Sequence, residues 1–196
     1  GAFLDPVYYG HYPELIMDRM EPHIRAGDLE AIRTDVDFQG LNQYFPSYIQ
    51  AAEGKAWPFQ HAEPPKYFRR TEMGWAIDGD CFYRTMKILQ ENYGNPPVFV
   101  TENGGAFTDI PGHNGYIDDQ DRISYYREYL GALLRAVSEG ANVQGYMPWS
   151  LLDNFEWAYG YEKRFGLVHV DYTTQKRTPK ASYEFMRKVI AQNALP

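Results

Sequence analysis

The segment Pro97-Val98-Phe99-Val100-Thr101-Glu102-Asn103-Gly104-Gly105 decides the fold predicted for this chain. Its apolar run is too short for a helix and lies between turn-forming residues, so it predicts a strand buried on both faces. Strands of that kind belong to parallel sheets covered by helices. Glu102 then falls at the carboxyl end of the strand, where α/β barrels and open α/β sheets place their chemistry, although a solvated strand end is the alternative. Gly104 and Gly105 would let the backbone turn sharply beside it.

Strand and helix patterns alternate along the rest of the chain. Strands are predicted over 36–44 and 143–150, and a hairpin arm over 166–172. Helices are predicted over 12–20 and 81–93, and two more begin after 118–121 and after 178–180. Residues 1–10 are predicted to form a loop and residues 46–79 a long connection. Asp78 or Asp80 is expected to cap one helix, and the acidic segment 118–121 is better interpreted as another cap than as a calcium loop. This order predicts parallel, right-handed β-α units.

Each predicted strand ends in polar or aromatic residues, at Asn42 and Tyr44, at Glu102 and Asn103, and at Trp149. Strand ends that converge on one rim are typical of the active face of a (β/α)8 barrel. A full barrel needs roughly 250 residues, so the 196 residues here correspond to about half of one. We treat residues 1–196 as one domain, because no internal repeat or convincing linker is visible.

Composition excludes several classes of protein. The net charge of −7 argues against a nucleic-acid partner, and no apolar run approaches the ~20 residues of a membrane span. The single Cys81 rules out an internal disulfide. No two histidines have ligand spacing, so we expect no metal and no cofactor. A cytoplasmic location is expected because no signal peptide is visible, although the chain start, Gly1-Ala2-Phe3, does not resemble a natural one.

Three motifs are distinctive: Thr101-Glu102-Asn103-Gly104, the run from Trp149 to Trp157 (WSLLDNFEW), and the run from Lys163 to Tyr172 (KRFGLVHVDY). They closely resemble glycoside hydrolase family 1, the β-glucosidase family. Shorter matches occur at 3–6, 40–44 and 73–75. Together the matches span nearly the whole chain. The resemblance implies a retaining glycosidase and identifies the chain as the C-terminal part of a (β/α)8 TIM barrel, strands six to eight with their helices.

The resemblance also implies roles for individual residues. Glu102 would be the nucleophile and Tyr44 the phenol that holds it. Asn42 would belong to the same polar network. Trp149 would lie under the sugar ring, and Glu156 and Trp157 would bind its hydroxyls. Phe165 would line the pocket, and Trp75 would form a wall of the leaving-group subsite. Aromatic faces suit the C–H faces of a sugar, while a carboxylate and an indole N–H suit its hydroxyls. A carboxylate at Glu156 also disfavours phosphorylated sugars.

One part of the family pattern is missing. The acid/base glutamate of the family lies in an Asn-Glu-Pro motif, which this sequence does not contain. A retaining glycosidase requires two carboxyl groups, one to attack and one to protonate the leaving group. We therefore expect the second to come from an N-terminal half of the barrel, as a separate chain or a missing segment, and the chain alone to be inactive. The expected substrate is a β-glucoside or cello-oligosaccharide.

Two other functions stay open from the sequence. Half a site with Trp149, Glu156 and Trp157 could hold a carbohydrate weakly without catalysis. A half-barrel could also be purely structural and dimerise through its open edge. Near these motifs, Asp153 and Asn154 are interpreted as turn or capping residues, and Lys163 and Arg164 as structural or solvated.

Overall fold

The computed structural model describes residues 1–55 and 57–196. Contacts divide the chain into two compact units, Gly1–Gln39 and Gly40–Pro196, and each is described by itself. That the chain is one domain, 1–196, therefore stays a prediction.

The first unit is helical. It holds α1 (Leu4–Tyr9), α2 (Glu14–Met20), the 3-10 helix η1 (Glu21–His23) and α3 (Asp28–Ile32). The loop expected over 1–10 is wrong, because Leu4–Tyr9 forms a helix whose Pro6 lies in the first turn, where no backbone N–H is needed. Gly10 ends that helix in a left-handed conformation, with φ of 72°.

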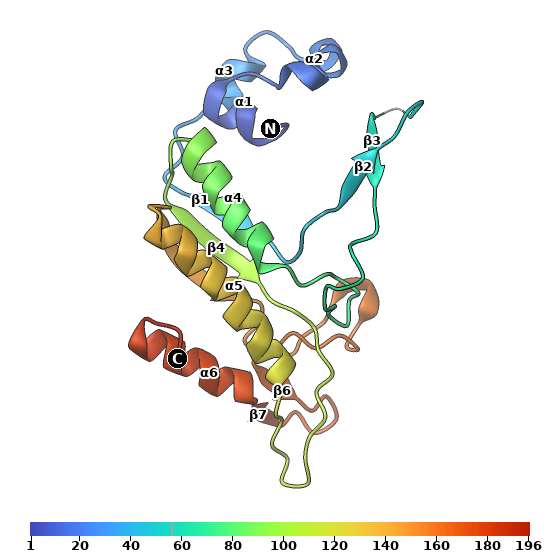
Figure 1. Cartoon of the computed structure of the whole chain (residues 1–196), viewed down its shortest axis with the longest axis vertical. Helices are drawn as coiled ribbons and strands as arrows, with labels where there is room; N and C mark the ends of the chain where they lie inside the picture. The colour runs from blue at the N-terminus through green and yellow to red at the C-terminus, as the bar shows by residue number, and fades with distance from the viewer. Residues whose placement is uncertain (56) are drawn as a thin grey trace. The chain divides into compact units, whose positions relative to one another are not determined.

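The second unit contains a three-stranded sheet in the order β1 (Gln39–Asn42), β4 (Val98–Asn103), β5 (Val143–Pro148). β4 and β5 are parallel, as predicted from their sequences. The helix α4 (Gly79–Asn92) precedes β4, and α5 (Gln120–Ser138) connects β4 to β5. These two helices pack side by side (Figure 1). The carboxyl ends of β4 and β5 therefore lie at one edge of the sheet, as a partial barrel requires.

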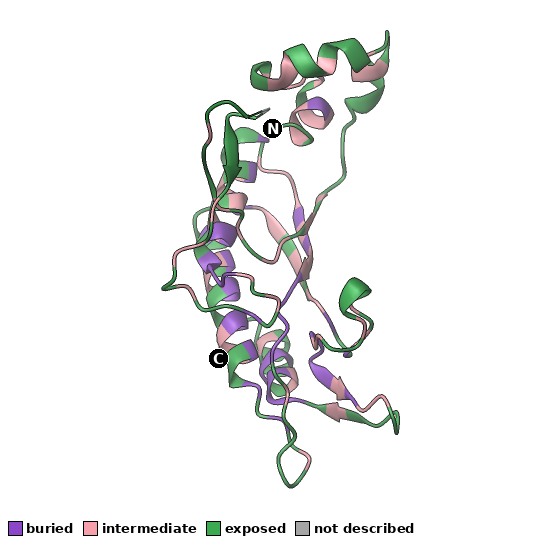
Figure 2. Ribbon diagram, turned by 90° about the vertical axis from the view of Figure 1, so that its right-hand side faces the viewer, coloured by how far each residue is buried: buried purple, intermediate pink, exposed green. Residues whose placement is uncertain are grey.

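The core lies between the helices and one face of the sheet. Val98 and Val100 of β4 are buried, together with Phe82 and Met86 of α4 and Tyr125 of α5. Buried positions gather on the inner sides of these helices (Figure 2). The expectation that β4 is buried on both faces is wrong for this chain, because alternate residues such as Phe99 and Thr101 are only half-buried. Phe99 and Thr101 lie on the side of the sheet that faces the inside of a barrel. With only half of the barrel present, this side is partly open to solvent.

The remaining elements extend the second unit. β2 (Ile49–Ala51) and β3 (Phe59–His61) form an antiparallel pair within the long connection, for which the sequence predicts no strands. β6 (Val168–Val170) and β7 (Arg177–Pro179) form the expected hairpin, separated from β5 by the short helix η2 (Trp157–Tyr159) and followed by α6 (Ala181–Gln192). Across the described ranges 1–55 and 57–196, no helix combines the length and apolar character needed to cross a membrane.

The predicted aspartate caps do not act as caps. Asp78 and Asp119 occupy the cap positions of α4 and α5, but neither side chain bonds the helix backbone there. The Asp78 carboxylate instead accepts from Arg84 at 3.1 Å. The Asp119 carboxylate pairs with Arg122 and accepts from the Ser182 hydroxyl at 2.5 Å. Charged donors compete well with a neutral backbone N–H for a carboxylate, so the ion pairs displace the caps.

Candidate active site

A short hydrogen bond joins the two residues at the centre of the site. The Tyr44 hydroxyl donates to Glu102 Oε2 at 2.5 Å. Glu102 lies near the end of β4, and Tyr44 follows β1. The backbone of Tyr44 is itself fixed, because the hydroxyls of Tyr125 and Tyr129 donate to its carbonyl at 3.1 and 2.9 Å. Burial, followed by the bond to Glu102 and its charge, raises the pKa of Tyr44, so the phenol stays protonated and remains a donor.

A shift in strand register places this carboxylate. Val100 pairs with Tyr146 and Asn103 with Pro148, so three steps along β4 match two along β5. An extra residue of this kind forms a bulge, which re-aims side chains and is frequent next to active sites. The consecutive residues Thr101 and Glu102 both bond side chains from the β1 strand and its continuation. Strict alternation would have sent them to opposite faces.

Asn103 and Gly104 fix the backbone after the bulge. The fully buried Asn103 side chain donates to the Gln43 carbonyl at 2.7 Å and accepts from the Tyr146 hydroxyl at 2.7 Å. A Cβ on Gly104 would lie 2.0 Å from the carbonyl oxygen of Trp149. Gly104 is therefore needed for close approach of two backbones. The sharp turn expected at Gly104 and Gly105 is wrong, because neither residue lies in a turn or bend and neither has a positive φ.

Beside Glu102 lies a cavity of about 290 Å³. Every predicted site residue except Asn42 lines it: Tyr44, Trp75, Glu102, Trp149, Glu156, Trp157 and Phe165. Asn42 is exposed, and its side-chain oxygen accepts from the Thr101 hydroxyl at 2.6 Å, so its sugar-binding role stays a prediction. Phe155 also lines the cavity. Sequence reasoning gave it no role, although it directly precedes Glu156 in the recognised motif.

Aromatic rings form one wall of the cavity. The Trp75 ring lies 5.4 Å from Tyr44 and 6.0 Å from Phe165, measured between centroids. The Tyr44 and Phe165 rings meet edge-on at 6.3 Å. Rings that contact one another at these distances hold each other in place. The wall offers flat apolar faces beside two carboxylates, a combination suited to a ligand with both C–H faces and hydroxyl groups.

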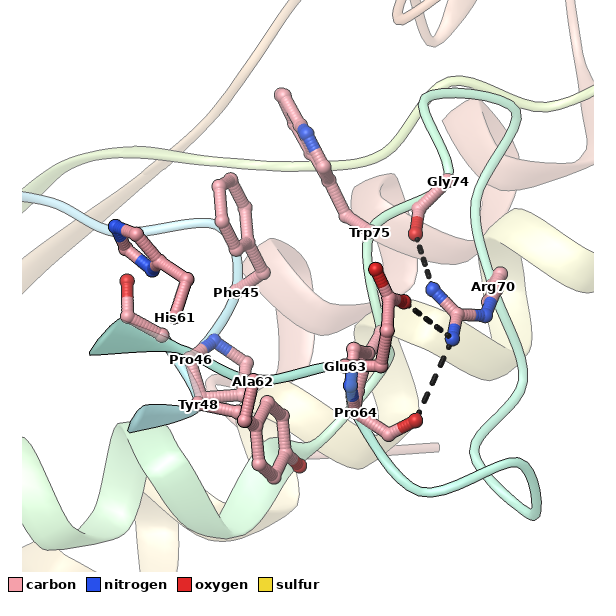
Figure 3. A pocket seen from close by; sticks show the side chains of 12 residues that line it. Phe45, Pro46, Tyr48, His61, Ala62, Glu63, Pro64, Arg70, Gly74 and Trp75 are labelled. Atoms are coloured by element: carbon pink, nitrogen blue, oxygen red, sulfur yellow. Dashed lines mark hydrogen bonds and ion pairs between the residues drawn. The ribbon is translucent and has the colours of Figure 1, made fainter. Parts of the chain in front are cut away.

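A second hollow, of about 330 Å³, shares Trp75 with the first (Figure 3). Phe45 stacks on Trp75 there, with centroids 4.7 Å apart and planes 27° from parallel. Arg70 bonds the Gly74 carbonyl at 2.9 Å and lies 3.8 Å from the exposed Glu63 (Figure 3). Trp75 therefore stands between two adjoining hollows and can contact a ligand that extends through both.

Two carboxylates face the first cavity, and they influence each other. The pKa of Glu156 is raised, first by burial and then by the negative charge of Glu102. Its hydrogen-bond-accepting, ionised form therefore becomes dominant at a higher pH than for an ordinary glutamate. This coupling between the two groups can be measured directly.

Replacing Glu102 by glutamine should lower the pKa of Glu156. The substitution removes the neighbouring charge but keeps the shape, whereas the burial of Glu156 remains, so the pKa should stay above its ordinary value. NMR titration of isotope-labelled glutamate carboxyl groups would measure the shift. Glu63→Gln, in the adjoining hollow, is the control and should leave the pKa of Glu156 unchanged. An unaltered titration in Glu102→Gln would show that the two carboxylates do not share one cavity.

Metal ligands do not gather in the described part of the chain. Within residues 1–55 and 57–196, no three His, Cys, Asp or Glu side chains lie together as ligands of a metal ion would. The chemistry that the site can perform with its own residues is that of a carboxylate nucleophile held by a phenol.

Comparison with known proteins identifies the family of the chain. The sequence model of glycosyl hydrolase family 1 matches residues 1–195. β-Glucosidase A of Thermotoga maritima is 40% identical over 98% of this chain, and the bifunctional β-D-glucosidase/β-D-fucosidase of Bifidobacterium breve is 39% identical over 98%. The chain spans only 44% and 46% of those two proteins.

Solved structures agree in fold. The family 1 β-glucosidase of Thermotoga maritima, at 39% identity, superposes on 100% of this chain with a TM-score of 0.90, and 44% of that protein is covered. Its complex with deoxynojirimycin gives a TM-score of 0.91. The motifs, the parallel strands, the cavity and these matches agree, and the chain belongs to glycosyl hydrolase family 1 as part of its (β/α)8 barrel.

Proposed function

We propose that this chain supplies the nucleophile and the sugar-binding half of the active site of a retaining β-glucosidase. The observation that carries the proposal is the hydrogen bond between Tyr44 and Glu102 within a cavity that also contains Glu156. A nucleophilic carboxylate must be ionised, and a phenol donor stabilises that form. An aromatic wall and a second carboxylate provide the contacts that a sugar ring requires.

The reaction proceeds by double displacement. Glu102 attacks the anomeric carbon while a second carboxyl group protonates the departing oxygen, which gives a glycosyl ester of Glu102 and the free alcohol. Water, deprotonated by the same second group, then attacks the anomeric carbon, breaks its bond to the Glu102 carboxylate and releases the sugar with its original configuration. Glu156 accepts hydrogen bonds from the sugar hydroxyls, and the indole N–H of Trp157 donates to them. Trp149 packs against the ring.

The leaving group is proposed to lie toward Trp75. This ring separates the sugar cavity from the hollow lined by Phe45 and His61 (Figure 3), so a second sugar unit would contact Trp75 on leaving the first cavity. Two relatives from Thermotoga neapolitana carry the name 1,4-β-D-glucan glucohydrolase. These observations support a β-glucoside or cello-oligosaccharide as the substrate.

The second carboxyl group is proposed to come from an N-terminal half of the barrel. The chain spans less than half of its relatives, and its sequence lacks the Asn-Glu-Pro motif. The inner face of the sheet also leaves Phe99 and Met147 partly open to solvent, with Met147 46% exposed. Apolar surface of this kind is normally covered.

Completing the barrel tests the proposal. Mixing this chain with the N-terminal part of the Thermotoga maritima relative, or fusing the two, should produce hydrolysis of nitrophenyl β-glucoside, with the β-anomer as first product by NMR. Each half alone is the control. A folded, completed barrel without turnover would contradict the proposal.

Weak carbohydrate binding by the chain alone is the second candidate. It is favoured by one observation, that Trp149, Glu156 and Trp157 line the same cavity. Calorimetry with glucose and cellobiose on the isolated chain would detect it. If the isolated chain binds sugar and the completed barrel shows no turnover, carbohydrate binding is the function. A chain that binds no sugar and sediments as a symmetric dimer would indicate a structural role.

A further inference from the structure

A buried aspartate closes the loop that carries Glu156. Asp153 is only 4% exposed, and its carboxylate accepts four hydrogen bonds. Oδ1 accepts from Gly166 N at 2.9 Å and Lys180 Nζ at 2.8 Å. Oδ2 accepts from Arg164 at 2.6 Å and from Val170 N at 3.3 Å. The side chain that begins the segment 153–166 therefore bonds the residues that end it.

The two ends of this loop also touch through their backbones. Ser150 N donates to the Phe165 carbonyl at 3.3 Å, and Leu167 N donates to the Ser150 carbonyl at 2.9 Å. A Cβ on Gly166 would lie 2.2 Å from Asp153 N, so only glycine fits there. A loop with joined ends keeps its shape as a unit, and its tip follows the position of its base.

The tip of the loop has fewer supports. Trp157 is 82% exposed and has φ of 41°, a backbone conformation that costs a non-glycine residue free energy. Such a residue keeps its conformation only where the surrounding structure fixes it. The backbone bonds of Glu156 stay within the tip: its N donates to the Gly160 carbonyl at 2.6 Å, and its carbonyl accepts from Tyr159 N at 2.8 Å. The geometry of the tip therefore depends on the closure at Asp153.

A buried ionic chain continues from Asp153 toward the loop after Glu102. Lys180, with its side chain inaccessible to solvent, bonds both Asp153 and Asp109. Asp109 follows β4 and pairs with Arg122 at 2.9 Å. Arg122 in turn donates to the Arg164 carbonyl at 2.8 Å, beside the cavity residue Phe165. Removing one partner from such a buried pair leaves a charge unpaired, so these groups hold each other firmly in place.

We infer that Asp153 is a positioning residue, which through Lys180 and Arg164 holds Glu156 at a set place relative to Glu102 and so determines affinity for the sugar. The inference rests on the proposed function. Burial alone would raise the pKa of Asp153, but Lys180 and Arg164 outweigh it and lower that pKa, so the carboxylate is ionised. Neither Asp153 nor its partners Lys180 and Arg164 line the cavity, so their effect on the sugar is indirect.

Asp153→Asn in the completed barrel tests this role. Asparagine replaces one acceptor oxygen with an N–H₂ group and removes the charge that Lys180 and Arg164 share. We expect the Kd for deoxynojirimycin, measured by calorimetry, to rise about tenfold or more with unchanged stoichiometry. The KM for nitrophenyl β-glucoside should rise more than kcat falls. Asp171→Asn is the matched control. Among the described residues, the Asp171 carboxylate accepts only from the turn of the β6–β7 hairpin, so this variant should leave both Kd and KM unchanged.

The stoichiometry separates positioning from folding. A fall in the number of binding sites with an unchanged Kd would mean that Asp153 only supports folding, and the inference would be overturned. Should Asp153→Asn fail to fold, Arg164→Lys, which keeps the charge, decides the question: a raised Kd with full stoichiometry supports positioning, and an unchanged Kd refutes it. A wild-type barrel that neither binds nor hydrolyses would instead refute the proposed function, on which the role of Asp153 depends.

Discussion

Replacing Glu102 by alanine should abolish hydrolysis of aryl β-glucosides by the completed barrel, with a loss in kcat on the order of 10⁴-fold or more. Glu102 is the carboxylate to which Tyr44 donates at 2.5 Å, and it lies in the same cavity as Glu156 and Trp149. Without it no glycosyl ester can form, so the first step of the double displacement is lost. Steady-state kinetics with nitrophenyl β-glucoside would measure the loss.

Rescue by a small anion makes this prediction specific. Azide can occupy the space vacated in Glu102→Ala and attack the anomeric carbon in place of the carboxylate. The product would then be the α-glycosyl azide, because only one displacement takes place. Glu63→Ala, which removes an exposed carboxylate from the adjoining hollow, is the control and should keep wild-type turnover. Full activity in Glu102→Ala would remove Glu102 from its role.

The strands could be predicted because their signals are local, whereas Trp75, Glu156, Trp157 and Phe165 were predicted through the resemblance to a known family. The apolar run before Glu102 and the run ending at Trp149 each identify a strand, and the structure has β4 and β5 at these places. Parallel strands bring their carboxyl ends to one edge. Tyr44, Glu102 and Trp149 therefore meet although they are far apart in sequence.

The features that sequence reasoning missed depend on contacts between remote segments. Lys180 lies 71 residues from Asp109, and nothing local to either residue predicts their pairing. Asp119 was expected to cap a helix, and it instead pairs with Arg122 and Ser182, the latter 63 residues away. Likewise the bulge at Thr101 is a property of two strands together, so the sequence of β4 alone cannot predict that Asn42 bonds Thr101 rather than Glu102.

Tyr44→Phe should lower kcat in the completed barrel without preventing folding. The substitution keeps the ring that packs against Trp75 and Phe165 but removes the hydroxyl that donates to Glu102. Hydrogen bonds to charged groups contribute about 1.5–3 kcal/mol, so a loss on the order of 10- to 10²-fold is expected. Steady-state kinetics with nitrophenyl β-glucoside would measure the loss, and circular dichroism would confirm that the variant folds.

A second tyrosine provides a matched control for this substitution. The Tyr83 hydroxyl donates to Glu139 at 2.6 Å, nearly the same contact, but on the exposed surface of α4. Tyr83→Phe should leave kcat unchanged, since water replaces the donor there. If Tyr44→Phe kept the wild-type kcat, the hydroxyl would have no part in the reaction and Tyr44 would act only through its ring. The two variants together therefore separate the hydrogen bond to Glu102 from the packing of the Tyr44 ring in the cavity wall.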